Sequence, residues 1–324
     1  MRTHLLRTVS AAALMLLITQ TPPAKADAQK SPFQIILELY GGVPSGDKQI
    51  WSDPCPCSPL TIKPDFHAGG VVGVVGSMSH FLPGSHPGWG FGMFARFGTS
   101  NNASEGRVTY YHYNVLGGNY PSYYTAGRAR HRETHAIVDF EARRDVGLGG
   151  DDSTRITLKA GVRFAHFRAD TNTQFTFLPS PYYTLRERRR SRFFGAGPRI
   201  GAEVTLPLAY GFTLDLAASG SVLFGQQSTS VNAVGGLGGI SAVDRRRFAK
   251  TVALLDGEAA VSYVFPTSMA KISIGTKVDA WLNVHDTRTK DYIPGFPLDP
   301  VFGKRNASRF WVSPFVRVTV PIGG

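Results

Sequence analysis

The chain has 324 residues, of which 42% are hydrophobic and 18% charged, and it carries a formal net charge of +12. This length fits a single domain. No apolar run reaches the roughly 20 residues that a membrane-spanning helix needs, which excludes a helical membrane protein. The positive charge does not indicate nucleic-acid binding, because no recognition motif accompanies it.

The N-terminus has the pattern of a secretory signal peptide. Arg2 and Arg7 make a basic start, residues 9–18 form a short apolar run, and residues 24–26 read Ala-Lys-Ala, a small-x-small cleavage site. This order of basic, apolar and small residues directs export and is then removed. We therefore expect residues 1–26 to be a signal peptide.

Two long stretches in the middle of the chain alternate between apolar and polar residues. In residues 194–206 every even position is apolar and every odd position is small or polar, and a similar pattern returns in residues 212–224 after a turn at residues 207–211. Successive side chains of a strand point to opposite faces, so a period of two gives one apolar and one polar face. Strands this long, with two such faces, are typical of an outer-membrane barrel hairpin.

Eight further segments carry related patterns, which gives ten expected strands. In chain order these are residues 33–41, 66–78, 88–97, 134–144, 154–168, 193–206, 212–225, 247–265, 270–284 and 309–322. Short connections (82–87, 147–153, 207–211 and 266–269) alternate with long ones (43–65, 98–133, 169–192, 226–246 and 285–308).

Alternation of short and long connections indicates the topology. Barrels of the bacterial outer membrane have tight periplasmic turns and longer extracellular loops. We therefore expect residues 27–324 to form an all-β fold, an antiparallel up-and-down transmembrane β-barrel of about 10 strands. Residues 108–115 either extend a hairpin above the membrane or add strands, which sets the range at 10–12.

Many charged side chains fall on the face expected to point into the lumen. They include both signs, so they either line a pore or pair with one another, as Asp139 and Arg163 or Arg199 and Glu203 would, and close it. A slight basic excess would favour anions in an open pore. The expected lumen charges are Arg143, Arg155, Lys159, Arg163, Arg199, Glu203, Asp139, Glu141, Asp256, Glu258, Lys277, Asp279 and Arg317.

Three arginine clusters lie where expected extracellular connections enter the membrane. Guanidinium groups match the geometry of phosphate, and the outer leaflet presents the phosphates of lipopolysaccharide. We expect lipopolysaccharide contact there; the alternative is solvated loop charge. The residues are Arg128, Arg130, Arg132, Arg186, Arg188, Arg189, Arg190, Arg192, Arg245, Arg246 and Arg247.

Catalytic and metal-binding patterns are weak. An enzyme of this class needs a nucleophile and a base, or a carboxylate and a histidine, at one rim. We expect His135 near the outer rim and His166 among the lipid-facing residues, and neither has a nucleophile motif beside it. Cys55 and Cys57 favour a loop crosslink or free thiols. We therefore predict no enzyme, cofactor or metal, and assign an interfacial girdle to Trp89, Tyr210, Phe212, Tyr263, Trp281 and Trp311.

Residues of the expected barrel resemble a known family over roughly positions 89–281. The motifs are Gly195-x-Gly197-Pro198-Arg199-x-Gly201, Gly161-Val162-Arg163, Asp139-x-Glu141 and Ser221-x-Leu223-x-Gly225. With them the chain resembles the Legionella-type major outer membrane protein family of pore-forming proteins. The resemblance implies an outer-membrane location and a porin-like role. Such barrels usually end in an aromatic residue that helps assembly, whereas this chain ends Pro321-Ile322-Gly323-Gly324.

Three functions follow from these features. The first is a porin-like, pore-forming protein that passes small solutes and weakly favours anions. The second is a closed structural or adhesive surface barrel that binds lipopolysaccharide, and the third is an outer-membrane hydrolase. The expected partners are outer-membrane lipid, lipopolysaccharide and small solutes, without nucleic acid.

Overall fold

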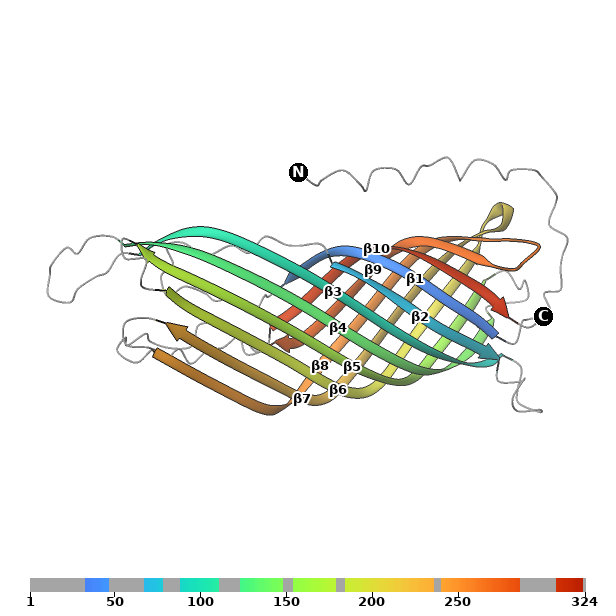
Figure 1. Ribbon diagram of the computed structural model, residues 1–324. Coiled ribbons are helices and arrows are strands. Elements are labelled where there is room, and N and C mark those ends of the chain that lie inside the picture. The colour runs from blue at the N-terminus through green and yellow to red at the C-terminus, as the bar shows by residue number, and fades with distance from the viewer. Residues whose placement is uncertain are drawn as a thin grey trace.

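Ten antiparallel strands close into a barrel in the computed structural model, which describes residues 33–46, 67–77, 88–110, 123–147, 154–178, 184–235, 240–285 and 307–322 (Figure 1). Each strand pairs with its neighbours in the chain, and β1 pairs with β10 to complete the ring. The expected all-β, up-and-down barrel is confirmed. No helix in the described part is long and apolar enough to cross a membrane. The strands are β1 (Phe33–Gly46), β2 (His67–Ser77), β3 (Trp89–Tyr110), β4 (Tyr123–Gly147), β5 (Arg155–Leu178), β6 (Thr184–Pro207), β7 (Phe212–Gly235), β8 (Ile240–Val264), β9 (Lys271–His285) and β10 (Ala307–Ile322).

The signal peptide expected at residues 1–26 lies outside the described residues, and so do Cys55 and Cys57. The predictions for them remain predictions.

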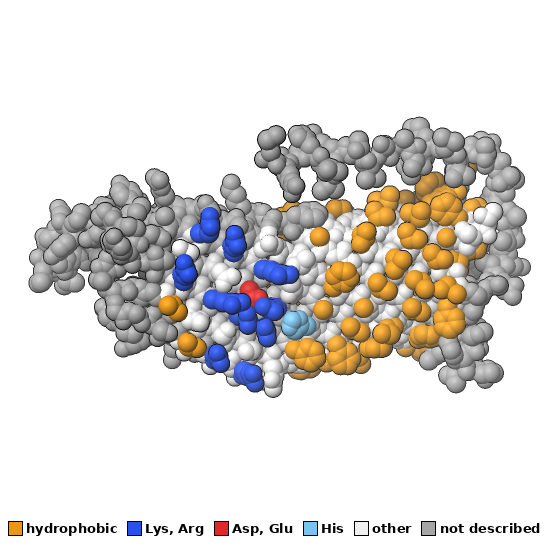
Figure 2. All heavy atoms as spheres, in the orientation of Figure 1, with side chains coloured by type: hydrophobic (Ala, Val, Ile, Leu, Met, Phe, Trp, Pro, Cys, Tyr) orange, Lys and Arg blue, Asp and Glu red, His pale blue; other side chains and the backbone are white. Residues whose placement is uncertain are grey.

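The even-numbered apolar positions of β6 and β7 face outward, as the alternation requires. Ile200 is 70% exposed and Phe224 62% exposed on the outer wall, although both are large and apolar. Figure 2 shows such side chains as a broad band on the face in view, and every strand from β1 to β10 carries exposed large apolar residues, which extend the band into a belt. Apolar surface on this scale is stable only against acyl chains, so the belt is the membrane-spanning part.

The turns from β6 to β7 and from β8 to β9 lie at one end of the barrel (Figure 1). The start of β1 and the end of β10 lie at the same end. Residues 208–211 connect β6 to β7, where a short 3-10 turn (Ala209–Gly211) places Tyr210 at φ 61°. β8 and β9 are joined by a turn in which the amide of Met269 donates to the carbonyl of Phe265. This is the periplasmic end of the predicted topology.

The middle strands are longer than the sequence pattern predicted. β3 to β8 have 22–25 residues, whereas β1, β2, β9 and β10 have 11–16. The connections expected at residues 98–133, 169–192 and 226–246 are therefore mostly strand, and β3 pairs with β4 as far as Tyr110 and Tyr123. Beyond the belt both faces carry polar residues, so the alternation of hydropathy disappears while the strand continues.

Charge on the belt should destabilise the barrel according to depth. We expect Ile200→Arg, near the middle of the outward face of β6, to lower the free energy of unfolding by about 2–4 kcal/mol. Tyr210→Arg, at the exposed turn, is the matched control and should cost roughly 0–1 kcal/mol. Urea unfolding in lipid vesicles measures both. Equal effects at the two positions would mean that the belt does not face lipid.

Candidate functional site

Charged side chains bridge the lumen between opposite strands. Arg96 on β3 donates to Asp256 on β8 at 2.7 Å and to Asp279 on β9 at 2.5 Å. β3 and β8 lie five strands apart in either direction around the ring. Arg163 on β5 contacts Asp139 at 2.7 Å and Asp256 at 2.5 Å, and its side chain is 1% exposed. The lumen at this level is thus filled by one connected network.

The other predicted lumen charges extend this network toward the periplasmic end. The guanidinium of Arg199 pairs with Glu141, rather than with Glu203 as the sequence suggested. Glu203 instead accepts from Arg143 at 2.9 Å and is 2.6 Å from Lys159. Lys277 contacts Glu38, and Arg317 reaches Glu258 at 2.6 Å. Arg155 lies at the rim, 56% exposed, where it pairs with Asp145.

A second layer, made of aromatic and apolar side chains, lies inside the barrel above the charges. Trp281, Trp311 and Phe167 are buried inside the barrel. The ring of Phe167 on β5 lies 6.0 Å from Trp311 on the opposite strand β10, and 5.3 Å from Trp281. Around them lie Ile137, Ala165, Ala169, Phe193, Leu223, Val252, Leu254 and Val284.

Assigning Trp281 and Trp311 to the interfacial girdle was therefore wrong. Both are 0% exposed, because they occupy odd positions of β9 and β10, the same inward parity as Lys277 and Arg309. Aromatic residues suit both a membrane interface and a packed core, so residue type alone misplaced them.

Histidines take part in this aromatic layer. His135 stacks on His67 with ring centroids 5.0 Å apart, and its Nε2 lies 3.1 Å from the hydroxyl of Tyr40. Gly98 makes room for both rings, since a Cβ at that position would lie 2.6 Å from Nε2 of His67. His135 is thus packed inside the barrel rather than placed at an open rim. This cluster was not predicted from the sequence, although the inward parity of His135 was a usable signal.

Above the aromatic layer, Glu133 joins opposite parts of the barrel once more. It accepts from Arg309 at 2.6 Å and lies 2.8 Å from Nε2 of His131. His131 also lies 2.8 Å from the hydroxyl of Thr171. All four side chains are buried, so this group continues the closed interior.

On the outer wall, arginines gather immediately beyond the apolar belt. Figure 2 shows basic side chains crowded together next to the belt, around acidic atoms. We call this surface the arginine field. Among the side chains that the structure describes, it comprises ten outward-facing arginines: Arg128, Arg130 and Arg132 on β4, Arg168 on β5, Arg186, Arg188, Arg190 and Arg192 on β6, and Arg245 and Arg247 on β8.

Strand register makes the field continuous. Asp170 is opposite Arg132 on one side and Arg190 on the other, and Arg168 is opposite Arg192. Polar side chains occupy the positions between the arginines of β4, β6 and β8: Asn172, Gln174, Ser228, Ser230 and Asn232. The row nearest the belt contains His166 and Phe194, so the field begins where the membrane ends.

Asp170 is the acidic residue at the centre of the described field. Its carboxylate accepts from Nε of Arg168 at 2.5 Å and from Nε of Arg190 at 2.7 Å. Burial alone would raise the pKa of Asp170, but the hydrogen bonds from Arg190 and Arg168 hold it below its ordinary value. Asp170 is thus a carboxylate at neutral pH and balances one of the surrounding arginines.

Two arginines predicted to contact lipid do not belong to the field. Arg189 is 3% exposed and pairs inside the barrel with Glu187. Arg246 is at an even position of β8, which faces inward. Alternation places every second residue of a basic run on the other face. Arg168 was not among the predicted lipid contacts. It belongs to the field because it is at an even position of β5, which faces outward.

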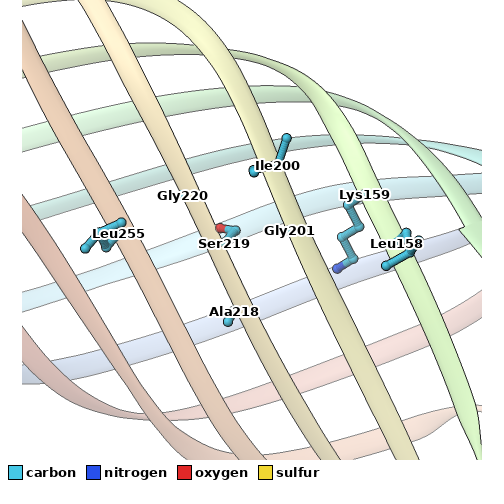
Figure 3. Close-up of a pocket in the computed structure, with 8 residues that line it drawn as sticks. All are labelled: Leu158, Lys159, Ile200, Gly201, Ala218, Ser219, Gly220 and Leu255. Atoms are coloured by element: carbon cyan, nitrogen blue, oxygen red, sulfur yellow. The ribbon is translucent and has the colours of Figure 1, made fainter.

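The lipid-facing wall has a shallow depression across β5 to β8, shown in Figure 3. Leu158, Ile200 and Leu255 line it together with Lys159 and Ser219, and Gly201 and Gly220 leave space between them. Its exposed lining is mainly apolar, so it suits an acyl chain. In the described part of the chain, no group of three or more His, Cys, Asp or Glu residues is placed to hold a metal ion.

The model of a family described as Legionella pneumophila major outer membrane protein precursor matches residues 83–312. No curated protein matches the chain.

Solved structures with some similarity are also outer-membrane proteins. The outer membrane protease OmpT from Escherichia coli is 12% identical, with 89% of this chain and 97% of that chain covered and a TM-score of 0.43. A major outer membrane protein from Thermus thermophilus is 10% identical, with coverage of 88% and 98% and a TM-score of 0.30.

The buried ion pairs should matter far more than the rim pair. We expect Arg163→Met to lower the free energy of unfolding by about 3–5 kcal/mol, because it removes the buried cation that contacts both Asp139 and Asp256. Arg155→Met removes the exposed pair with Asp145 and should cost no more than about 1 kcal/mol. Urea unfolding followed by tryptophan fluorescence compares the two. Similar losses would show that the lumen network is solvated rather than buried.

Proposed function

The chain belongs to the family of the Legionella pneumophila major outer membrane protein, and we propose that it is a closed outer-membrane barrel that binds lipopolysaccharide through the arginine field. It is a protein of the bacterial outer membrane. The observation that carries the proposal is the placement of ten arginines on one continuous outer surface beside the apolar belt. The role is structural or adhesive, at the cell surface.

The position of the field favours a lipid headgroup as the ligand. Acyl chains cover the belt, so the headgroups of the same molecules lie against the next rows of residues. Guanidinium forks bind phosphate with paired, charge-assisted hydrogen bonds. Lipopolysaccharide carries phosphates at this depth of the outer leaflet, which makes it the ligand that fits both the charge and the location.

The interior supports a closed barrel. Arg96 and Asp256 meet from opposite strands in the charged layer, and Phe167 and Trp311 do so in the aromatic layer. A continuous water path would have to break contacts at both levels. The role is also proposed to be non-enzymatic, since the interior histidines pack against aromatic rings or bond to Tyr40, Thr171 and Glu133.

A porin-like role, with weak anion preference, is the second candidate. It is favoured by the exposure of charges toward the periplasmic end, where Glu203 is 27% and Lys271 24% exposed, in contrast to 1% for Arg163. A solute can therefore enter the lumen at this end. It would pass only if the two layers separated.

Planar-bilayer recording distinguishes the two candidates. We expect the purified, folded wild-type protein to show no discrete conductance steps, because both layers block the lumen. A variant with Arg96→Ser, Trp281→Ala, Trp311→Ala and Arg309→Ser should conduct, since it removes side chains from both layers and from the Glu133 group above them. Discrete steps from the wild type would overturn the closed barrel in favour of the pore.

Lipopolysaccharide binding should depend on the field and not on net charge. We expect Arg188→Ser with Arg192→Ser to weaken binding of lipopolysaccharide to the detergent-solubilised protein by about 2 kcal/mol, roughly thirtyfold, at about 1 kcal/mol per arginine. The control is Arg144→Ser with Arg155→Ser, which removes the same charge at the periplasmic end. Binding that falls equally in both variants, or in neither, would refute the proposed site.

A further inference from the structure

Asp170 is an unusual residue in a surface proposed to bind anions. A carboxylate there repels phosphate, and its side chain, at 12% exposure, is held among the arginines rather than extended into solvent. Its two oxygens are divided between neighbours: one accepts from Arg168 on the same strand and the other from Arg190 on β6. Asp170 thus fixes the two guanidinium groups relative to each other.

The contacts with Asp170 use Nε of each arginine. Each guanidinium has five N–H donors in a planar fork, and the Nε contact leaves its terminal Nη groups for another acceptor. Arg168 and Arg190 come from adjacent strands and are about one-third exposed, at 35% and 31%. Two partly desolvated guanidinium groups therefore lie side by side at the surface. The Nε atom of each is bound by the same carboxylate.

Charge around this pair is not balanced within the described surface. Arg168 is directly opposite Arg192, and Arg132 is opposite Asp170 on the other side. Like charges directly opposite each other on neighbouring strands are destabilising. One carboxylate is surrounded by four arginines, so Asp170 alone does not neutralise their mutual repulsion. A doubly charged anion would reduce that repulsion further.

The pair also lies at a defined depth. Arg168 is two residues from His166 along β5, and His166 is directly opposite Phe194 at the edge of the belt. Two residues of a strand span about 7 Å. An anionic group bound by Arg168 and Arg190 is therefore within one headgroup length of acyl chains that cover the belt.

We infer that Asp170 is a positioning residue that holds Arg168 and Arg190 as a clamp for one phosphate monoester carried by a lipid of the outer leaflet. This inference rests on the proposed lipopolysaccharide contact and names the group within the field that recognises phosphate. The dianion accepts from the Nη groups of both arginines, while Arg132 and Arg192 supply further positive charge. The remaining arginines of the field add electrostatic attraction.

Asp170→Asn separates positioning from simple charge. Removal of a negative charge beside an anion site raises the affinity if the field acts by charge alone. If Asp170 positions the clamp, the isosteric amide releases one of the two arginines, and affinity for bisphosphorylated lipid A in detergent micelles falls roughly tenfold. Asp170→Glu keeps the carboxylate and should recover part of the loss. Asp145→Asn, which makes the same charge change at the periplasmic rim, should leave binding unchanged.

Two further arms identify the source of the phosphate and protect the test. Inorganic phosphate should compete with lipid A only at concentrations far above those of the lipid; equal potency would mean a soluble ligand and overturn the lipid assignment. Higher affinity of Asp170→Asn, with weakened binding by Arg188→Ser and Arg192→Ser, would overturn the clamp and leave the proposed function standing. Unchanged binding in the double arginine variant would overturn the proposed function itself. Unaltered heat-modifiable migration on gels verifies that each variant is folded.

Discussion

Closure of the backbone ladder between β1 and β10 is the constraint on which the rest of the molecule depends. It satisfies the main-chain hydrogen bonds along both edges, which is what allows strands to cross hydrocarbon at all. It also leaves each side chain only two directions, toward the lipid or toward the axis. Because the outward positions of the belt must be apolar, the charged residues within the belt are placed on the axis. There, in a ring of only ten strands, they are close enough to meet.

Inside such a narrow ring, a charge needs a partner more than it needs water. Arg163 is almost completely buried, and a lone buried charge is far more costly than a paired one. The mixture of signs along the inward faces is therefore explained by packing as well as by conduction. The aromatic layer above it fills the interior by a different means, since Trp281 and Trp311 occupy volume without requiring a counter-charge. Two layers of unlike chemistry oppose opening for different physical reasons.

Alternation predicted the strands and the direction of nearly every charged residue, because it follows from the geometry of a strand and needs no knowledge of the partners. It could not predict which inward charges meet: Arg96 and Asp256 are 160 residues apart and touch only because the ring closes. The predictions for Trp281 and Arg189 were wrong because they gave residue type more weight than the parity of the position. At Asn283 the φ of 65° and the register shift between β9 and β10 place Val284 inside with His285, and no two-residue period announces that change.

Strand extension and the arginine field belong together. Only β3 to β8 continue well beyond the level at which β1, β2, β9 and β10 end (Figure 1), and the field lies on β4, β5, β6 and β8 of that extended wall. Loops of the same composition would present arginines too, but without a fixed spacing. On paired strands, register sets which arginine faces which, and so allows one carboxylate, Asp170, to hold guanidinium groups from two strands. The six-strand wall is thus what turns a basic composition into a surface with defined geometry. Among the described side chains the field lies on one side of the barrel, so the proposed contact with anionic lipid is directional.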